Sequence, residues 1–464
     1  MNSKSLFFIT FLGFSTLNSQ YTIASTSLNQ SAQLNADSKA ATTLEVSVSN
    51  STKNERHDEP VVIDLKEYSM IRSALVTDAD GKEIPCQLDD LDGDDQMDEL
   101  CFLVDLKPKS NASFDVKLFR EGEPRQYTPR VYAEMLMRND KVKQKNQHNN
   151  FIESITARGD CANSYNLQHH HGVSFESELN GIRIYFDKRQ TLDLYGKFKK
   201  RLELQDTQFY TQADQKEKGY GDDVLWVGNT FGLGAFRGWN GSESTMIDPV
   251  KTRTQRVVSY GPLRTIVEII DRGWKASADK APINMTIRYT QYGGHRDTDV
   301  DVFFNKDVSD YTFSTGIINI ENSEEYSDHN GLRACWGTDW PSTDTLKWKR
   351  ETLGLAICIP QKNITKEVAA VKGSRGGDYT FVVKSSADRI SYKVAYSSAN
   401  EEFGFHSAAD WFRWVRDWKR DICNPIKVKC KIKKEKTSLF SISYSSSRQV
   451  AESFTSLDII LPEQ

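Results

Sequence analysis

The feature that most constrains the fold is a succession of short segments in which apolar and polar residues alternate, or in which a few apolar residues run together. Successive side chains of a β-strand point to opposite faces of the sheet, so such segments predict strands. Helical periodicity is scarce, and the sequence therefore predicts a mainly β protein. The expected strands include Leu44–Val48, Val61–Leu65, Phe102–Leu106, Ala112–Leu118, Gly181–Phe186, Arg256–Val258, Thr265–Ile270, Met285–Tyr289, Asp297–Phe304, Leu355–Ile359, Tyr379–Val383 and Leu439–Ile442.

The length of the chain and the spacing of these segments predict more than one domain. The 464 residues are too many for a single small core. Closely spaced strands, separated by turn signals such as Asp80-Gly81, predict a small β-sandwich or barrel over residues 43–120. We expect a polar connector over 121–150 and a large β-sandwich domain over 151–464.

The N-terminus has the pattern of a signal peptide over residues 1–24. Lys4 supplies a short positive region, Leu6–Leu17 is apolar, and a small-residue cleavage region follows at Ser19–Ala24. The apolar stretch is too short to span a bilayer, so we expect no integral membrane segment. Residues 25–42 are expected to form a flexible leader. The pattern predicts a periplasmic or secreted protein.

One segment, residues 407–420, predicts an amphipathic helix. Ser407 and Asp410 have the spacing of a capping box. Trp411, Trp414, Val415 and Trp418 follow at helical spacing and form one apolar stripe. A tryptophan stripe can bind sugar, but anchoring the helix to the back of a sheet explains it as well.

Composition and missing motifs narrow the function. The net charge is −4 and the charges are interspersed, which argues against a nucleic-acid partner. Phosphate-binding loops, esterase elbows and zinc-protease helices are not found in the sequence. None of the seven cysteines forms a C-x-x-C pair. Cys86 with Cys101, or Cys423 with Cys430, could form disulfides, although buried, unpaired cysteines are the preferred interpretation.

An acidic loop predicts a structural calcium site. Asp90, Asp92, Asp94, Gln96 and Asp98 follow the D-x-D-x-D-G-x-x-D pattern, with the backbone carbonyl of Gln96 as one oxygen ligand. The sixth position of the pattern, where glycine is usual, is Asp95. The twelfth position lacks glutamate, so the loop is not a full EF-hand. An acidic turn without a metal is the alternative.

The candidate catalytic residues lie in two segments. His169, His170 and His171 precede an alternating segment in which Val173 and Phe175 should face the core, so that His170, Ser174, Glu176 and Glu178 share the other face. Glycines surround Tyr220 and suggest a shaped loop. The catalytic candidates are His169, His170, His171, Tyr210, Tyr220 and Asp222.

The candidate substrate-binding residues combine aromatic rings with charged groups. Aromatic faces pack on the C–H faces of sugars, and a guanidinium binds a carboxylate through two hydrogen bonds. The candidates are Glu176, Trp239, Arg253, Arg256, His295, Trp336, Asp339 and Trp340. Together they favour a carbohydrate site over a protein interface.

The chain resembles a family of secreted bacterial proteins designated only as a domain of unknown function (DUF4861). The resemblance covers nearly the whole mature chain and rests on Gln87–Asp94, Asp98–Leu100, His170–Leu179, Gly221–Leu225, Asp248–Arg256 and Trp336–Pro341. Asp95 stands where the relatives tend to have glycine. Members often occur among polysaccharide-degradation genes of the Bacteroidetes, so the resemblance implies a carbohydrate setting but no catalytic residue. The large domain is also similar to the β-supersandwich of galactose-mutarotase-like proteins and several polysaccharide lyases.

Three functions compete. A lyase acting on uronic-acid-containing oligosaccharides would use Arg253 or Arg256 to neutralise the carboxylate, a histidine of 169–171 as base, and Tyr210 or Tyr220 as acid. A glycoside hydrolase would need two carboxylates, drawn from Glu176, Glu178, Asp222, Asp223 and Asp339. A non-catalytic carbohydrate binder or a mutarotase-like epimerase is the third. The sequence leaves the oligomeric state open.

Overall fold

The computed structural model describes residues 40–139, 141, 150–370, 376–385 and 387–433. The expected signal peptide, most of the leader and the expected strand at 439–442 lie outside these residues. Within them, no helix is both long enough and apolar enough to cross a membrane. The expectation of a mainly β protein is confirmed.

The smaller domain contains two antiparallel sheets that share one apolar core. The five-stranded sheet has the order β27–β1–β7–β3–β4, and the three-stranded sheet has the order β2–β6–β5. The strands are β1 (Thr42–Ser49), β2 (Arg56–Asp64), β3 (Ser73–Asp78), β4 (Glu83–Ile84), β5 (Cys86–Asp89), β6 (Glu99–Leu106), β7 (Asn111–Phe119) and β27 (Lys427–Ile432).

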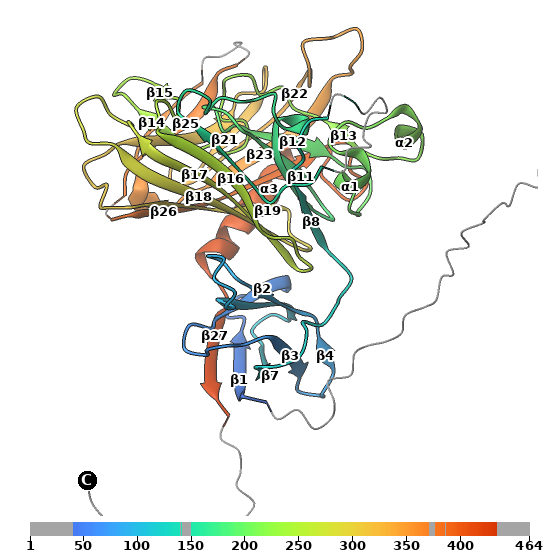
Figure 1. Cartoon of the computed structure of the whole chain (residues 1–464). Coiled ribbons are helices and arrows are strands. Elements are labelled where there is room, and N and C mark those ends of the chain that lie inside the picture. Colours follow the sequence, from blue (N-terminus) through green and yellow to red (C-terminus); the bar gives the residue numbers. More distant parts are fainter. Residues whose placement is uncertain (1–39, 140, 142–149, 371–375, 386, 434–464) are drawn as a thin grey trace, which may run out of the picture.

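The expected domain boundaries differ from the structure in two places. Strand β27 pairs with β1 along its whole length, so the chain returns to the smaller domain after finishing the larger one (Figure 1). Strand β8 (Val131–Glu134) lies in the expected connector but pairs with β10 of the larger domain. Both differences arise from pairing between segments distant in sequence, which local composition does not reveal.

The larger domain contains three sheets. One sheet, called the five-stranded sheet throughout, has the order β13–β12–β11–β10–β8. Besides β8 it contains β10 (Gly172–Ser177), β11 (Gly181–Tyr185), β12 (Leu192–Gly196) and β13 (Asp222–Asp223). The nine-stranded sheet, in spatial order, is β21 (Glu324–Ser327), β22 (Leu332–Asp339), β23 (Glu351–Cys358), β26 (Arg389–Ser398), β19 (Asp297–Phe304), β18 (Ile283–Tyr292), β17 (Arg264–Trp274), β16 (Thr252–Ser259) and β9 (Ser154–Arg158). The third sheet is β15 (Ser244–Thr245), β14 (Arg237–Trp239), β20 (Phe313–Ile318), β25 (Asp378–Val383) and β24 (Ile364–Val368).

These sheets enclose one large core. Val173 and Ile182 of the five-stranded sheet and Ile287 and Val300 of the nine-stranded sheet belong to the same buried cluster. Because side chains alternate along each strand, the opposite faces of these two sheets carry polar residues.

Three short helices border the five-stranded sheet, a further helical turn follows β23, and one long helix packs elsewhere. They are η1 (His169–His171), α1 (Leu204–Thr207), α2 (Ala213–Glu217), η2 (Gln361–Asn363) and α3 (Ala408–Cys423). In α3 the hydroxyl of Ser407 accepts a hydrogen bond from the backbone N–H of Asp410, which confirms the expected cap. Trp411, Val415 and Trp418 are buried against the back of the nine-stranded sheet, so the stripe anchors the helix.

Buried polar contacts join the two domains. Arg264 forms an ion pair with Asp89 at 2.6 Å. The side-chain amide of Gln87 donates to Ser259 Oγ at 2.8 Å, and its carbonyl accepts from the backbone N–H of Leu263 at 2.7 Å. The larger domain therefore holds the smaller one through hydrogen-bonded groups with fixed directions.

The seven cysteines are not joined by disulfides in this structure. Cys86, Cys101, Cys335 and Cys358 are buried, in line with the preferred interpretation, whereas Cys161, Cys423 and Cys430 are exposed. Cys86 and Cys101 lie on neighbouring strands but face Phe102 and Gln87 across the ladder, so they are not direct cross-strand partners.

Candidate functional site

The outward face of the five-stranded sheet carries a row of charged and polar side chains. Glu134 is paired with Ser174, Ser174 with Arg183, and Arg183 with Asp193 across four neighbouring strands. Directly paired residues point to the same face. The register therefore brings two carboxylates and a guanidinium into one row, which none of the individual strands reveals.

Arg183 is the centre of this row. Its Nη2 donates to Asp193 at 2.6 Å and to Asp223 at 2.9 Å, and its Nη1 donates to the Tyr210 hydroxyl at 3.2 Å. The guanidinium also lies over the ring of Phe209, 4.3 Å from its centroid. A planar cation with several fixed donors is well suited to orienting acidic and phenolic groups around it.

The Asp223 carboxyl beside Arg183 holds its proton more strongly than a free one. Burial raises the pKa of Asp223 well above its usual range, and the nearby charge of Asp193 raises it further. Asp193 also accepts a hydrogen bond from the Tyr185 hydroxyl at 2.6 Å. Two like charges competing for one cation favour the protonated form of one of them.

Glu134 and His170 form a second acid–base pair beside the row. His170 Nε2 lies 3.2 Å from Glu134 Oε1, and both side chains are fully buried. Burial raises the pKa of Glu134 to about 8, although hydrogen bonds from Tyr132 and Ser174 favour the ionised form. A carboxyl with such a pKa can carry a proton at neutral pH and is suited to proton transfer.

The three histidines lie in a strained turn that leads directly into β10. His170 and His171 have φ values of 44° and 72°, a left-handed conformation that residues other than glycine adopt at a cost. The turn lets His170 reach Glu134 while His171 stacks on Tyr165, with ring centroids 3.8 Å apart. The ring of His169 makes an edge contact with that of Tyr210.

His171 is half-buried and neutral at physiological pH. Burial lowers its pKa to about 4, although its hydrogen bond to the Tyr165 carbonyl favours the charged form. Because Nδ1 lies 3.0 Å from that carbonyl oxygen, Nδ1 must carry the proton and Nε2 keeps a lone pair. The guanidinium of Arg189 stacks on the rings of Tyr165 and Tyr185 beside it.

A buried ion pair holds the segment that carries Tyr210. Lys197 Nζ donates to Glu176 Oε2 at 2.5 Å. The same carboxylate accepts from the backbone N–H groups of Glu203 and Leu204 at the start of α1. Glu176 was expected to bind substrate, but it is fully buried and positions the loop over the sheet.

The other catalytic candidates lie at the margin of this face. The Tyr220 hydroxyl donates to Asp206 at 2.7 Å on the exposed side of the loop. Asp222 forms an ion pair with Lys216, whereas its neighbour Asp223 points to Arg183. Among the expected catalytic residues, the structure thus brings together His169, His170, His171 and Tyr210.

The expected arginine ligands are internal structural groups. Arg253 is fully buried, where it pairs with Asp271 at 2.8 Å and donates to the carbonyl of Ile247. Arg256 lies on the outward face of the nine-stranded sheet and donates to Glu268. Neither reaches Tyr210 or the histidines, which corrects the expectation that one of them neutralises a substrate carboxylate there.

The remaining binding candidates are dispersed. His295 lies at the domain boundary, where burial would lower its pKa but the hydrogen bond to Asp297 raises it to about 9. Trp336 packs under α3, and Trp239 lies at the end of β14. Asp339 ends β22 and accepts from the backbone N–H of Trp340. His295, Trp239 and the candidates in and after β22 therefore lie on different elements and do not form one site.

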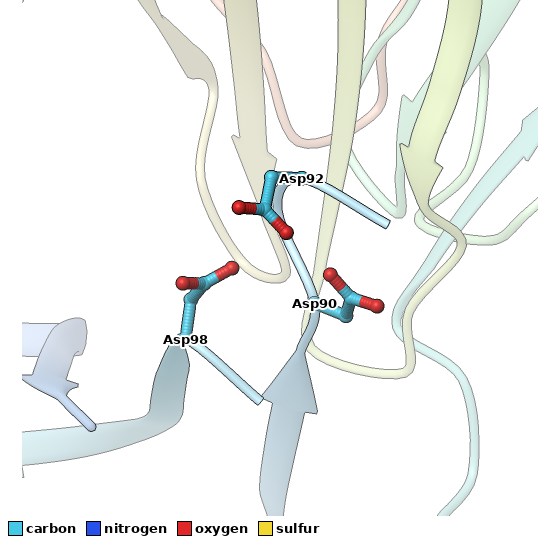
Figure 2. A group of neighbouring side chains, drawn as sticks. All are labelled: Asp90, Asp92 and Asp98. Carbon is cyan, nitrogen blue, oxygen red and sulfur yellow. The ribbon is translucent and has the colours of Figure 1, made fainter. Parts of the chain in front are cut away.

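The acidic loop gathers three of its five expected ligands. Carboxylate oxygens of Asp90, Asp92 and Asp98 lie within 4.8 Å of one another, close enough to share one cation (Figure 2). Asp94 accepts instead from the backbone and side-chain N–H groups of Gln96. Hard carboxylate oxygens suit calcium, and the calcium site stays a prediction.

Comparison with known proteins identifies the family of the chain. The profile described as "Domain of unknown function (DUF4861)" matches residues 48–428. The chain belongs to the DUF4861 family. The resemblance expected from the sequence is thereby confirmed. A search of curated proteins finds no significant match.

Solved structures show distant similarity to this DUF4861 protein. A glycosyl hydrolase family 38 protein from Enterococcus faecalis has a TM-score of 0.44 and 10% identity, covering 84% of this chain and 47% of its own. An α-mannosidase from Enterococcus faecalis V583 has a TM-score of 0.43 and 11% identity, covering 84% and 46%. The DUF4861 chain thus spans about half the length of each. A Klebsiella pneumoniae protein provisionally assigned as an aldose 1-epimerase has a TM-score of 0.28 and 8% identity, covering 62% and 95%.

Several residues of the candidate site in this DUF4861 protein are not among those expected from the sequence. Glu134 was assigned to the connector, and Arg183 and Tyr185 were recognised only as part of a strand. The signal that could have identified them is the alternation of Arg183 and Tyr185 with Ile182 and Ile184, which places charged and phenolic groups on the outward face.

Proposed function

We propose that this protein is a carbohydrate-active enzyme that acts by proton transfer at the outward face of the five-stranded sheet. The observation that carries the proposal is the convergence of Tyr210, His171 and Asp223 on Arg183 and its neighbours. These three side chains are only partly buried, so a substrate can reach them, while Glu134 and His170 lie beneath. Clustered groups of this kind are typical of acid–base catalysis.

The reaction we propose is β-elimination on a uronic-acid-containing oligosaccharide. Nε2 of His171 takes the proton next to the uronate carboxylate, the electrons form the new C=C bond, and the bond to the leaving oxygen breaks. The Tyr210 hydroxyl protonates that oxygen. Each step moves one proton or one electron pair, and no oxidant or reductant is needed.

Arg189 is the residue we assign to the uronate carboxylate. Its guanidinium stacks beside His171 and pairs with Asp187 at 2.6 Å, and its side chain remains partly exposed. An arginine can share its planar donors between a protein carboxylate and a substrate carboxylate. This role replaces the one expected for Arg253 or Arg256. The resemblance to proteins of polysaccharide-degradation loci and the expected signal peptide support a periplasmic or secreted uronide-processing role.

Glycoside hydrolysis is the second candidate. Glu134 and Asp223 lie on the same sheet face, and burial raises the pKa of both carboxyl groups. A hydrolase needs one protonated carboxylic acid and one carboxylate. The second carboxyl group that we assign is Asp193, which accepts hydrogen bonds from Arg183 and Tyr185.

The test is incubation of the purified protein with a panel of uronic-acid oligosaccharides and their neutral counterparts. A lyase creates a conjugated unsaturated uronide, which absorbs in the ultraviolet, and mass spectrometry shows no added water. A hydrolase creates reducing ends with addition of water and no new absorbance. Binding without either product, or a change of anomer ratio in the nuclear magnetic resonance (NMR) spectrum, would replace both proposals with a binder or an epimerase.

A further inference from the structure

The outward face of the nine-stranded sheet carries a second polar surface, on the other side of the large core from the candidate site. Arg256, Glu268, Arg288 and Asp301 are direct partners across β16, β17, β18 and β19. Their inward neighbours, such as Val267 and Ile287, belong to the core. Positive and negative side chains therefore alternate across the sheet.

Helix α3 covers only part of this face and leaves a cavity at its C-terminal end. The cavity has a volume of about 570 Å³, which lies in the range of small-molecule sites. Strands β19 and β26 provide Asp299, Asp301 and Lys393, while Cys358, Pro360 and Ile422 form the apolar side. Polar groups thus face an apolar wall across one hollow.

The charges in this cavity are balanced. Arg389 donates to Asp301 at 2.6 Å, Lys393 pairs with Asp299, and Lys419 pairs with Asp328 at 2.5 Å. An ionic ligand would compete with one of these pairs and leave a charge without its partner, which is unfavourable in a partly buried cavity. The balance therefore argues against an anion or a cation as the occupant.

A neutral sugar suits this arrangement. A hydroxyl group both donates and accepts, so it can accept from a cation and donate to the neighbouring carboxylate without separating them. Arg389 is 53% exposed, and its Nη1 has no hydrogen-bond acceptor among the described residues. Its guanidinium is held 4.9 Å from the centroid of the Phe303 ring. The apolar wall can receive the C–H face of a pyranose.

We infer that this cavity binds an uncharged saccharide unit and that it is a binding site separate from the candidate catalytic face. The inference does not rest on the reaction proposed above, because the nine-stranded sheet and the core separate the two surfaces. A protein with both surfaces can hold neutral residues of a heteropolysaccharide while it acts on acidic ones.

The test is isothermal titration of the full chain with a panel of neutral trisaccharides and with trigalacturonate. At least one neutral trisaccharide should bind, and its affinity should be nearly independent of salt because no net charge is neutralised. Arg389→Leu should weaken this binding at least tenfold. Arg413→Leu is the matched control, since Arg413 is also an exposed arginine paired with one carboxylate, and it should change the affinity less than twofold.

Two further measurements keep the inference open to refutation. Tyr210→Phe, on the candidate catalytic face, should leave the affinity for the neutral trisaccharide unchanged. Hydroxyl-radical footprinting of the unaltered protein should show protection of Ile422 and Cys423, which line the cavity, when that trisaccharide is bound. The assignment is overturned if no neutral trisaccharide binds or if Arg389→Leu leaves the affinity unchanged. Protection at His171 instead of Ile422 would overturn it as well. These outcomes are independent of the result of the enzyme assay.

Discussion

Lys197 Nζ lies 2.5 Å from Glu176 Oε2, and both side chains are completely buried beneath the loop that carries Tyr210. The ammonium also donates to the backbone carbonyls of Ser177 and Arg201, and the carboxylate accepts two backbone N–H groups. Every charge of the pair is thus compensated by hydrogen bonds. The arrangement fixes the loop to the sheet without exposing either group to a substrate.

Removing one partner of this pair should destabilise the protein strongly. Lys197→Met leaves the Glu176 carboxylate buried without its cation, and such losses typically cost about 3–5 kcal/mol in the free energy of unfolding. Urea denaturation monitored by tryptophan fluorescence measures the effect. Lys218→Met, which removes an exposed pair with Asp214, is the control and should leave stability almost unchanged. Equal effects of the two substitutions would contradict the buried role.

Glu134 should make the protein less stable as the pH rises. Its pKa is raised to about 8 in the folded state, against about 4.3 for a free glutamate. Between these values the folded state holds the proton more tightly, so stability is full below the lower value and is lost as the pH rises through 8. Comparing the urea midpoints of the unaltered protein and Glu134→Gln from pH 5 to 8 isolates this contribution. If the urea midpoints of the two proteins change with pH in the same way, the prediction is wrong.

His171 should titrate with the opposite consequence. Its pKa is lowered to about 4, so its imidazole is neutral in the folded protein while a free histidine becomes protonated near pH 6.5. Stability from this group is present above pH 6.5 and is lost as the pH falls toward 4. NMR of the imidazole C–H resonances should show the His171 signal shifting near pH 4. Assignment comes from the spectrum of His171→Gln, and a midpoint near 6.5 would refute the prediction.

Tyr210 and Tyr220 should differ in their effects on turnover. Tyr210→Phe removes the hydroxyl that Arg183 orients and should lower kcat by about 10²-fold, the usual contribution of a general acid. Tyr220→Phe removes a hydroxyl that donates to Asp206 on the exposed side of the loop, and it should lower kcat less than twofold. Both measurements use the substrate identified in the oligosaccharide panel. A larger loss for Tyr220→Phe would move the acid to the outer part of the loop.

Calcium should stabilise the small domain through Asp90, Asp92 and Asp98. We expect the thermal midpoint to rise when calcium is added to chelator-treated protein and to return when the chelator is restored. Asp90→Asn with Asp98→Asn should abolish the rise. Asp80→Asn, in an exposed turn outside this group, should retain it. If calcium does not change the thermal midpoint of the unaltered protein, the loop is an acidic turn without a metal.

The sequence predicted the local structure well. The expected strand Asp297–Phe304 coincides with β19. The expected helix at 407–420 begins one residue before α3 begins. Val173 and Phe175 face the core while Ser174 and Glu176 face outward, as alternation predicted. These features depend on neighbouring residues alone, which is why a single sequence can reveal them.

The site could be predicted only in part, because it depends on pairing between distant strands. The row from Glu134 to Asp193 exists only when β8, β10, β11 and β12 are aligned in register. Arg253 shows the opposite failure. Its residue type suits a substrate carboxylate, but the fold supplies Asp271 as a buried partner, and that partner lies on a neighbouring strand.

The pairing of β27 with β1 means that the smaller domain can be completed only at the end of synthesis. Strands β1 to β7 appear first, yet β1 keeps an unpaired edge until residues 427–432 arrive, after the whole larger domain. Contacts that close such long loops form late. The smaller domain therefore finishes folding last, and a nascent chain interrupted before residue 427 exposes a strand edge on which other chains can associate.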